Sequence, residues 1–408
     1  MNGGLARVDG PAAETGAPGA PGAPGPARDR PWPEARREAR RAAPAPLPAE
    51  QVEPAAALGR TLAEPLTAVT DLPGFDTSAM DGWAVAGPGP WRSAGRLLAG
   101  STPAPLADGC AVEIATGAQL PPGATGVLRR EHGRLVHGLL HGQVGPGQDV
   151  RPRGQECRRG EVLLPAGTPV TAAVLGLAAA AGHDRLTVRR RPTVELLLLG
   201  DELQDSGVPG PGRVRDALGP LLPPWLAAAG AEVTGCRRIG DDRALLRDAV
   251  RHASADVVVT TGGTASGPAD FLHPVLAGEG ARLLVDGVAV RPGHPMLLAA
   301  LPGGGHLVGL PGNPLAAAAG ALTLALPLLH ALAGRPAPRR RTESAAVDLP
   351  GHPADTRLVP VVRTADGLVP LPFDGPAMLR GLAVAEAVAV VPPGGVRAGG
   401  PAEVLALP

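Results

Sequence analysis

Glycine-rich and polar segments follow three apolar runs of the chain that predict buried strands. Ligands of an open parallel sheet bind beyond the carboxyl ends of its strands, so these segments are the first candidates for a site. Glycines there allow backbone N–H groups to approach a phosphate, and a helix that begins behind them adds a favourable dipole. We therefore expect a phosphate-bearing ligand. The segments are Gly200-Asp201-Glu202, Gly262-Gly263-Thr264 and Pro311-Gly312-Asn313-Pro314.

Carboxylates occur in the same predicted loops, at Asp201, Glu202, Asp216 and Asp270. Several carboxylates near one phosphate repel it unless a divalent cation lies between them, which favours a Mg²⁺ site. Spacing alone leaves an alternative open. Asp216 could instead cap a helix, and Asp270 could be a solvated loop residue.

The elements that would position these residues alternate between strands and helices across residues 191–334. The strands are apolar throughout, as parallel strands covered on both faces must be. We therefore predict a doubly wound α/β domain over this range. Its expected elements are strands at 193–199, 232–236, 256–261 and 307–310, and helices at 220–229 and 242–253.

The rest of the chain predicts a multidomain α/β protein. Residues 1–30, rich in Gly, Pro and Ala, predict a disordered tail. Short apolar runs between turns predict a small β domain over 71–150, inserted into a discontinuous linker domain formed by 31–70 and 151–190. A β-barrel-like domain is expected over 342–408.

Three helices are expected in the linker domain. They span 33–43, 55–68 and 172–181, and Thr171 should cap the third of them.

Composition excludes several classes of protein. The formal net charge is zero, so no overall field attracts the chain to nucleic acid or to an anionic membrane. The three cysteines, Cys110, Cys157 and Cys236, are far apart and form no CxxC pair, which argues against disulfides and a thiolate zinc site. The start of the chain lacks the pattern of a secretory signal. The apolar run 315–332 contains Gly, Pro and His, so we expect a buried helix and a cytoplasmic protein.

Several motifs resemble one known family, the molybdopterin molybdenumtransferases of the MoeA and gephyrin E-domain type. Residues 75–85, FDTSAMDGWAV, are similar to the family's F-D-N-S-A-M-D-G-Y/F-A-V, and residues 115–124 resemble its T-G-A-x-x-P-x-G-A segment. Further matches follow in the family's order at 151–156, 160–168, 200–203 and 311–314, so that the resemblance covers about residues 50–400.

This resemblance implies an elongated, four-domain homodimer. Molybdopterin would bind in the α/β domain, and the inserted β domain of the partner subunit would complete the site. The implied reaction uses molybdate and Mg²⁺ to hydrolyse adenylylated molybdopterin, which inserts molybdenum and releases AMP. Other proteins of molybdenum cofactor biosynthesis would be further partners.

The resemblance also assigns site residues. The catalytic set that it implies is Asp81, Thr116, Glu156, Asp216 and Asp270. The metal-binding set is Asp201, Glu202, Asp216 and Asp270. The pterin-binding set is Gly262, Gly263, Thr264, Ser266, Arg291, His294, Pro311, Gly312, Asn313 and Pro314.

The chain departs from the family's motifs at several of these positions. Ala217 and Leu218 replace a Ser and an Asn after Asp216, and the serine of the glycine-rich loop is shifted by one position to Ser266. The family's K-P-G-K-P is here Arg291-Pro292-Gly293-His294-Pro295, which exchanges one permanent charge for an imidazole. Most polar groups of a C-terminal motif at 375–386 are also absent.

Two alternatives to an active enzyme remain at this point. A degenerate relative would bind a pterin or a partner protein without turnover, as Ala217, Leu218 and His294 favour. An unrelated sugar- or nucleotide-binding α/β enzyme rests on fold analogy alone and leaves the motif at 75–85 unexplained.

Overall fold

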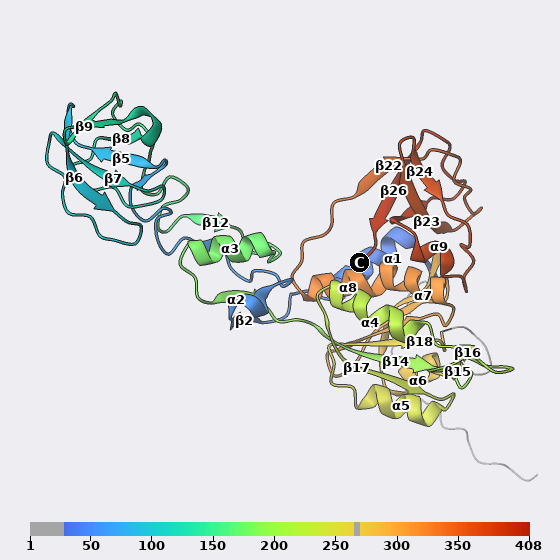
Figure 1. Cartoon of the computed structure of the whole chain (residues 1–408). Coiled ribbons are helices and arrows are strands. Elements are labelled where there is room, and N and C mark those ends of the chain that lie inside the picture. Colours follow the sequence, from blue (N-terminus) through green and yellow to red (C-terminus); the bar gives the residue numbers. More distant parts are fainter. Residues whose placement is uncertain (1–27, 265–269) are drawn as a thin grey trace, which may run out of the picture.

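The computed structural model describes residues 28–264 and 270–408. The described chain is elongated, with a small β unit at one end, a narrow linker unit in the middle, and a wide body at the other end (Figure 1). The body contains the α/β domain and the C-terminal β domain. Ser266, one of the expected pterin-binding residues, lies outside the described residues.

The α/β domain is doubly wound, as predicted. Its parallel strands β14 (Thr193–Leu199), β17 (Glu232–Ile239), β18 (Val257–Thr261) and β21 (His306–Leu310) lie in the order β17-β14-β18-β21. The chain leaves β14 for β17 on one side and then crosses to β18 on the other. This reversal opens a crevice at the carboxyl ends of β14 and β18.

Helices cover both faces of this sheet (Figure 1). Helices α4 (Leu218–Ala228), α7 (Pro314–Gly320) and α8 (Leu326–Leu332) pack into the core of one face, together with Val194, Leu196 and Leu198. Helices α5 (Arg243–Arg251) and α6 (Leu272–Gly278) pack on the other, where Leu197 points. This alternation follows from the two-residue period of a strand.

Two strands that the sequence did not predict extend the sheet. Strand β19 (Arg282–Arg291) and β20 (Leu297–Ala300) form an antiparallel hairpin, and β20 pairs with β21. The hairpin loop carries His294, and Arg291 ends β19. The edge strand β1 (Arg28–Pro31) pairs in parallel with β19.

Residues 31–41 lie in the body, so their assignment to the linker domain was wrong. Helix α1 (Trp32–Arg41) buries Trp32, Ala35 and Ala39 on one face and contacts α8 and β19. The indole Nε1 of Trp32 donates to Oγ1 of Thr323 at 3.0 Å, inside the body's core. Burial of this apolar stripe explains why α1 packs here.

The apolar run at 314–332 is a core helix, as expected. The segment is long and apolar enough to cross a membrane, but 89% of it is buried inside the protein. A π-helical turn (Ala321–Ala325) joins α7 to α8. Because Pro327 lacks an N–H group, it cannot donate back to this turn. The Arg36 side chain donates to the carbonyl of Leu322 instead.

The linker unit consists of short strands and one helix. Strand β2 (Ala49–Val52) pairs with β13 (Leu186–Arg189), and β3 (Leu66–Thr67) pairs with β12 (Val162–Leu164). Helix α3 (Ala172–Ala180) is capped as predicted, because Thr171 Oγ1 accepts from Val174 N at 3.3 Å. The helix expected at 55–68 was wrong, since α2 (Pro54–Ala57) ends just before Gly59. Gly59 has a φ of +75° that breaks the helix.

The inserted β unit packs around two small hydrophobic cores. The unit far from the body is a six-stranded sheet in the order β8-β5-β7-β6-β10-β9. Its strands are β5 (Gly82–Val85), β6 (Trp91–Leu97), β7 (Cys110–Ile114), β8 (Gly126–Arg129), β9 (Arg134–Val136) and β10 (Leu139–His141). The pair β4 (Thr77–Ser78) and β11 (Val150–Arg151) joins this sheet to the linker unit.

The C-terminal domain is barrel-like, as predicted. Antiparallel pairing runs through β24, β23, β25, β26 and β22, and a bridge between Ala345 and Leu368 brings the two edges together. The strands are β22 (Arg341–Ser344), β23 (Thr356–Thr364), β24 (Gly367–Pro370), β25 (Ala387–Val391) and β26 (Pro401–Ala406), with helix α9 (Arg380–Ala383) between β24 and β25.

Candidate functional site

A cavity of about 270 Å³ lies at the carboxyl ends of the parallel strands, which we call the strand-end cavity. Segments after β14, β17, β18 and β21 line it. It therefore occupies the crevice that the reversal of strand order creates. The predicted site residues that line it are Glu202, Gly262, Gly263, Asp270 and Gly312.

Glycines form the floor of this cavity for a conformational reason. Gly262 and Gly263 have φ values of +87° and +66°, which residues other than glycine rarely adopt. Gly262 N donates to Leu310 O at 2.8 Å, and a Cβ added to Gly312 would lie 3.7 Å from Gly262 Cα. The two glycine-rich loops therefore meet, and Thr264 is buried behind them.

Two carboxylates that the sequence reasoning missed also line the strand-end cavity. Asp241 and Asp242 follow β17, and Asp242 caps α5 by accepting from Ala244 N at 2.6 Å. Their position directly after a strand could have identified them as site residues. It did not, because the predicted strand ended at residue 236, whereas β17 continues to Ile239.

The other two predicted metal ligands are placed differently. Asp216 caps α4, because its Oδ1 accepts from Leu218 N at 2.9 Å and from Gly219 N at 3.0 Å. Asp201 lies beside the strand-end cavity, where its N–H donates to Oδ2 of Asp241 at 3.4 Å. Within residues 28–264 and 270–408, no three His, Cys, Asp or Glu side chains converge as a ready-made metal site. The predicted four-carboxylate set is therefore only partly brought together.

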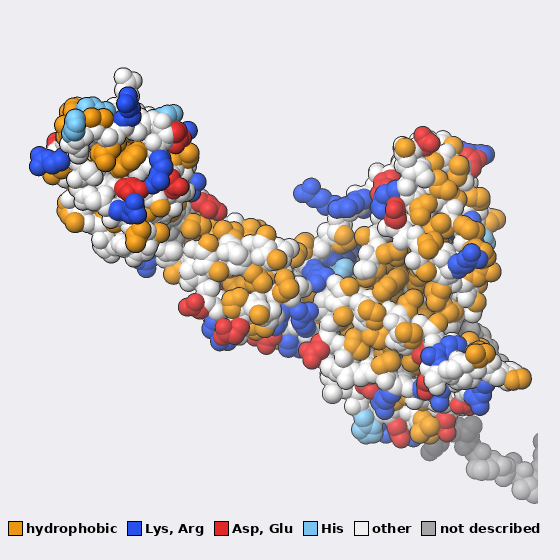
Figure 2. Space-filling view, viewed as in Figure 1, with side chains coloured by type: hydrophobic (Ala, Val, Ile, Leu, Met, Phe, Trp, Pro, Cys, Tyr) orange, Lys and Arg blue, Asp and Glu red, His pale blue; other side chains and the backbone are white. Residues whose placement is uncertain are grey.

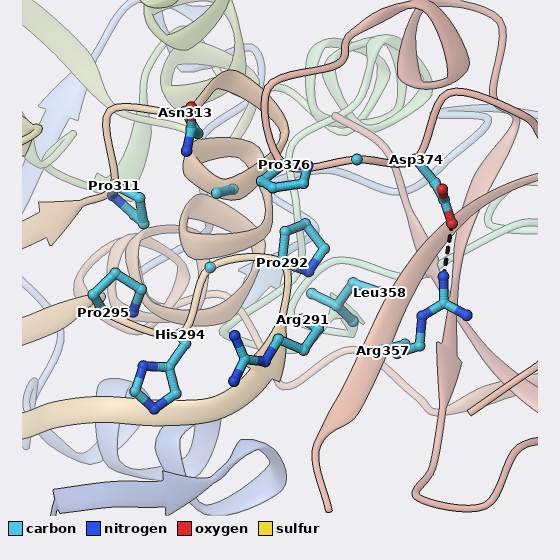
Figure 3. Close-up of a pocket in the computed structure, with 13 residues that line it drawn as sticks. Arg291, Pro292, His294, Pro295, Pro311, Asn313, Arg357, Leu358, Asp374 and Pro376 are labelled. Atoms are coloured by element: carbon cyan, nitrogen blue, oxygen red, sulfur yellow. Dashed lines mark hydrogen bonds and ion pairs between the residues drawn. The ribbon is translucent and has the colours of Figure 1, made fainter. Parts of the chain in front are cut away.

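A second cavity, of about 380 Å³, lies between the α/β domain and the barrel and is called here the interdomain cavity (Figure 3). Arg291 at the end of β19, His294 in the β19–β20 loop and Asn313 at the N-cap of α7 line it on one side, and the barrel supplies Arg357 and Asp374. Arg357 was not predicted. It lies opposite Arg291 in the β19–β23 pairing, a relationship that only the fold reveals.

Each basic side chain at this cavity has an acidic partner. Arg291 Nε lies 2.8 Å from Asp355 Oδ2, and His294 Nε2 lies 2.9 Å from Asp29 Oδ1. The third pair is Arg357 Nη2 with Asp374 Oδ2, at 2.7 Å (Figure 3). An anion that enters the cavity must therefore compete with carboxylates for these donors.

The Pro311–Pro314 motif lies between the two cavities. Pro311 and Asn313 line the interdomain cavity, whereas Gly312 lines the strand-end cavity. Pro314 is the first residue of α7, and Asn313 precedes it at the N-cap position. The Asn313 side chain makes no capping hydrogen bond within the described residues, so its amide is available to the cavity. One short motif thus contributes to both cavities.

The β unit brings together two predicted catalytic residues. Asp81 Oδ1 accepts from Thr116 N at 2.7 Å and from Thr116 Oγ1 at 2.9 Å. These hydrogen bonds, the backbone one foremost, lower the pKa of Asp81 below its usual value. Both residues are exposed, and so is Glu156 in a loop near the linker unit. Strands β5, β7 and β12, which are near these residues in the sequence, lie far from the α/β domain that carries the strand-end cavity (Figure 1).

Family models match most of the described chain. A model described as the MoeA N-terminal region, domains I and II, matches residues 30–182. A second, described as a probable molybdopterin binding domain, matches residues 195–331 and thus covers the strand-end cavity.

Individual relatives agree with these matches. The chain is 32% identical to the molybdopterin molybdenumtransferase of Nostoc sp., over 68% of each chain. It is 33% identical to molybdopterin molybdenumtransferase 2 of Mycobacterium tuberculosis, over 71% of this chain and 77% of that protein. The crystal structure of a molybdopterin biosynthesis MoeA protein from Pyrococcus horikosii aligns with a TM-score of 0.76 at 25% identity, and covers 93% of this chain and all of the other.

Proposed function

The chain belongs to the MoeA family of molybdopterin molybdenumtransferases, and from this premise we propose that it inserts molybdenum into adenylylated molybdopterin with release of AMP. Membership makes it a transferase of molybdenum cofactor biosynthesis that acts on molybdopterin and molybdate. The adenylylated form of the substrate, the use of Mg²⁺ and the roles of individual residues are the proposed parts.

One observation carries the proposal. The strand-end cavity combines two glycine loops with four carboxylates, Glu202, Asp241, Asp242 and Asp270. Glycine loops suit a phosphate because backbone N–H groups can approach it, whereas carboxylates alone would repel it. The two features are compatible when a divalent cation lies between them.

The donor chemistry of this cavity fits Mg²⁺. Mg²⁺ is usually bound by one or two carboxylates together with water and substrate phosphate oxygens, so a cage of protein ligands is not required. Glu202 and Asp270 would hold it, with Asp201 and Asp241 beside them. When bound, Mg²⁺ would neutralise charge on the phosphoanhydride that is cleaved.

Residues of this chain bind the phosphates and the molybdate. The N–H group of Gly263 binds the phosphates, because that of Gly262 already donates to Leu310 O, and the buried Thr264 follows in the same loop. Arg291, His294 and Arg357 attract the molybdate dianion to the interdomain cavity, where the Asn313 amide can orient it. The Pro311–Pro314 motif keeps the two substrates next to each other.

Asp81, Thr116 and Glu156 act in a different subunit from the cavity that they serve. The distance of the neighbouring strands β5, β7 and β12 from the α/β domain of the same chain supports a homodimer in which each β unit completes the site of its partner (Figure 1). In that position the Asp81 carboxylate, kept ionised by Thr116, can orient a water or an amine of the substrate. Asp216 supports the site indirectly by capping α4. We place this reaction in the cytoplasm, where other proteins of the same biosynthesis would deliver the pterin and accept the product.

The direct test is AMP release by the purified full-length protein. Given adenylylated molybdopterin, molybdate and Mg²⁺, the protein should release AMP and yield molybdenum-loaded cofactor. If molybdopterin binds but no AMP appears at any pH or Mg²⁺ concentration, the chain is a binding protein without turnover, and the proposed reaction is wrong.

A further inference from the structure

Basic side chains gather where the linker unit meets the body. Arg36 and Arg40 extend from α1, His330 from α8, Arg335 from the segment after α8, and Arg191 from the loop between β13 and β14. We call these five residues the junction cluster. Figure 2 shows arginine side chains collected at this narrow part of the molecule. The cluster is separate from both cavities described above.

Backbone carbonyls are the main hydrogen-bond partners of the cluster. Arg335 donates to Ala228 O at 3.2 Å and to Gly59 O at 2.7 Å, and so connects the end of α4 to the linker unit. Arg40 donates to the carbonyl of Arg335 at 3.1 Å. Arg191 donates to Leu58 O at 2.8 Å. The arginines thus hold three segments together without using a carboxylate.

The positive charge of the cluster is not balanced by acidic groups. None of the five side chains forms an ion pair within the described part of the chain. Glu403 faces Arg36 but is paired with Arg340, and Glu232 acts on Arg191 only at longer range. Two buried nitrogens, Arg40 Nη1 and Arg335 Nε, have no hydrogen-bond partner among the described residues. Such orphaned donors are rare in folded proteins.

Burial and mutual repulsion disfavour the charged forms of these five side chains. Burial lowers the pKa of Arg36 to about 10, and it also lowers the pKa values of Arg40, Arg191 and Arg335. Burial, together with the neighbouring Arg335, Arg40 and Arg36, lowers the pKa of His330 to about 4. An anion bound here would favour the charged forms and so raise each of these pKa values. The positive charge of the cluster therefore lacks a negative counterpart within the described residues.

We propose that the junction cluster binds a small tetrahedral oxyanion, either free phosphate or the phosphoryl group of a small phosphate ester. Guanidinium groups match the geometry of phosphate oxygens and bind them through paired N–H groups. Arg40, Arg191 and Arg335 contact the anion from α1, from the linker loop and from the segment after α8. The imidazole N–H of His330 donates the further hydrogen bond. Because these residues come from both the linker unit and the body, the bound anion stiffens the junction between them.

The test is calorimetric titration of the full-length protein with inorganic phosphate at constant ionic strength. The interdomain cavity also attracts anions, so the background variant is the double substitution Arg291→Gln and Arg357→Gln, which leaves the junction cluster intact. We expect one phosphate per chain in this background when Mg²⁺ is absent, because the carboxylates of the strand-end cavity then repel phosphate. Adding Arg40→Gln and Arg191→Gln should weaken binding by about tenfold or more. Adding Arg339→Gln instead, which changes an exposed arginine between α8 and β22, should leave phosphate binding unchanged.

A second measurement needs no arginine variant. The NMR titration of His330, identified by its loss in His330→Gln, should show its pKa rise from about 4 when phosphate is added. Glycerol 3-phosphate distinguishes the two forms of ligand: binding equal to phosphate indicates a phosphoryl group, and binding of phosphate alone indicates the free anion. No phosphate binding in the background variant, binding that Arg40→Gln and Arg191→Gln leave unchanged, or an unmoved His330 titration would each overturn the proposal.

Discussion

The imidazole Nε2 of His294 lies 2.9 Å from the carboxylate Oδ1 of Asp29, which links the loop at the interdomain cavity to the edge strand β1. Asp29 has a φ of +58°, and a Cβ on Gly287 would lie 2.7 Å from its Oδ1. Glycine at 287 therefore makes room for this carboxylate. The pair places a negative charge beside the group that replaces a lysine of the family's motif.

Removal of this negative charge should favour molybdate. In Asp29→Asn the imidazole keeps a hydrogen-bond partner but no longer faces a competing charge. We expect the KM for molybdate to fall by about threefold to fivefold, the size of an exposed ion-pair interaction. Steady-state AMP release at varied molybdate measures it. Glu34→Gln, an exposed change on the neighbouring α1, is the control and should leave the KM unchanged. A higher KM in Asp29→Asn would mean that the carboxylate assists binding.

Subunit mixing tests whether sites are shared between chains. Asp81→Asn disables the β-unit contribution, and the double variant Glu202→Gln and Asp270→Asn disables the strand-end cavity. An equal mixture that exchanges subunits should recover about a quarter of wild-type activity, since half of the dimers would contain one intact composite site. Activity no higher than that of the separate variants, in a mixture proven to exchange, would place each complete site within one chain.

The Asp81–Thr116 hydrogen bonds predict an acid titration. Because the pKa of Asp81 is lowered, its carboxylate stabilises the folded state above the unfolded pKa, and this contribution is lost as the pH falls through the folded pKa. Thr116→Val removes the hydroxyl donor but keeps the backbone donor, so the pKa of Asp81 should rise part of the way toward its usual value. NMR of the Asp81 carboxyl carbon measures this shift. Thr125→Val, whose hydroxyl donates to Val85 O in the same unit, should not move it.

The sequence predicted the strand-and-helix alternation of the α/β domain because its central strands are apolar on both faces. Strand β17 was predicted too short because it lies at the sheet edge, where Arg237 pairs with Glu195 and remains exposed. That error concealed Asp241 and Asp242. Local pattern could not reveal the β19–β20 hairpin either, since its apolar residues are buried between β21 and the barrel.

The site could be predicted as a set of motifs but not as two cavities. Strand-end position correctly brought Glu202 and Asp270 to one place, whereas Asp216 faces the first turn of α4 because that helix needs a cap. Arg357 carries no motif and becomes a site residue only through the pairing of β23 with β19. The same limit applies to α1, whose amphipathic pattern predicts a helix but does not say which domain covers its apolar face.

The position of α1 depends on one buried hydrogen bond. Thr323→Val keeps the shape of the side chain but leaves the Trp32 Nε1 donor unsatisfied, which should lower the free energy of unfolding by about 1–3 kcal/mol. Urea denaturation of the body, followed by tryptophan fluorescence, measures it. The exposed Thr364→Val is the matched control and should change stability by less than about 0.5 kcal/mol. Equal stabilities would show that helix packing alone holds α1.

The Mg²⁺ dependence of AMP release tests the central claim most directly, namely that the carboxylates of the strand-end cavity act on the substrate's phosphates. The double variant Glu202→Gln and Asp270→Asn should need far more Mg²⁺ and should lose about 100-fold or more in kcat/KM. Asp248→Asn, an exposed change on α5, should behave like the wild-type protein. If the folded double variant releases AMP at the wild-type rate with unchanged Mg²⁺ dependence, the strand-end cavity is not the site of the reaction.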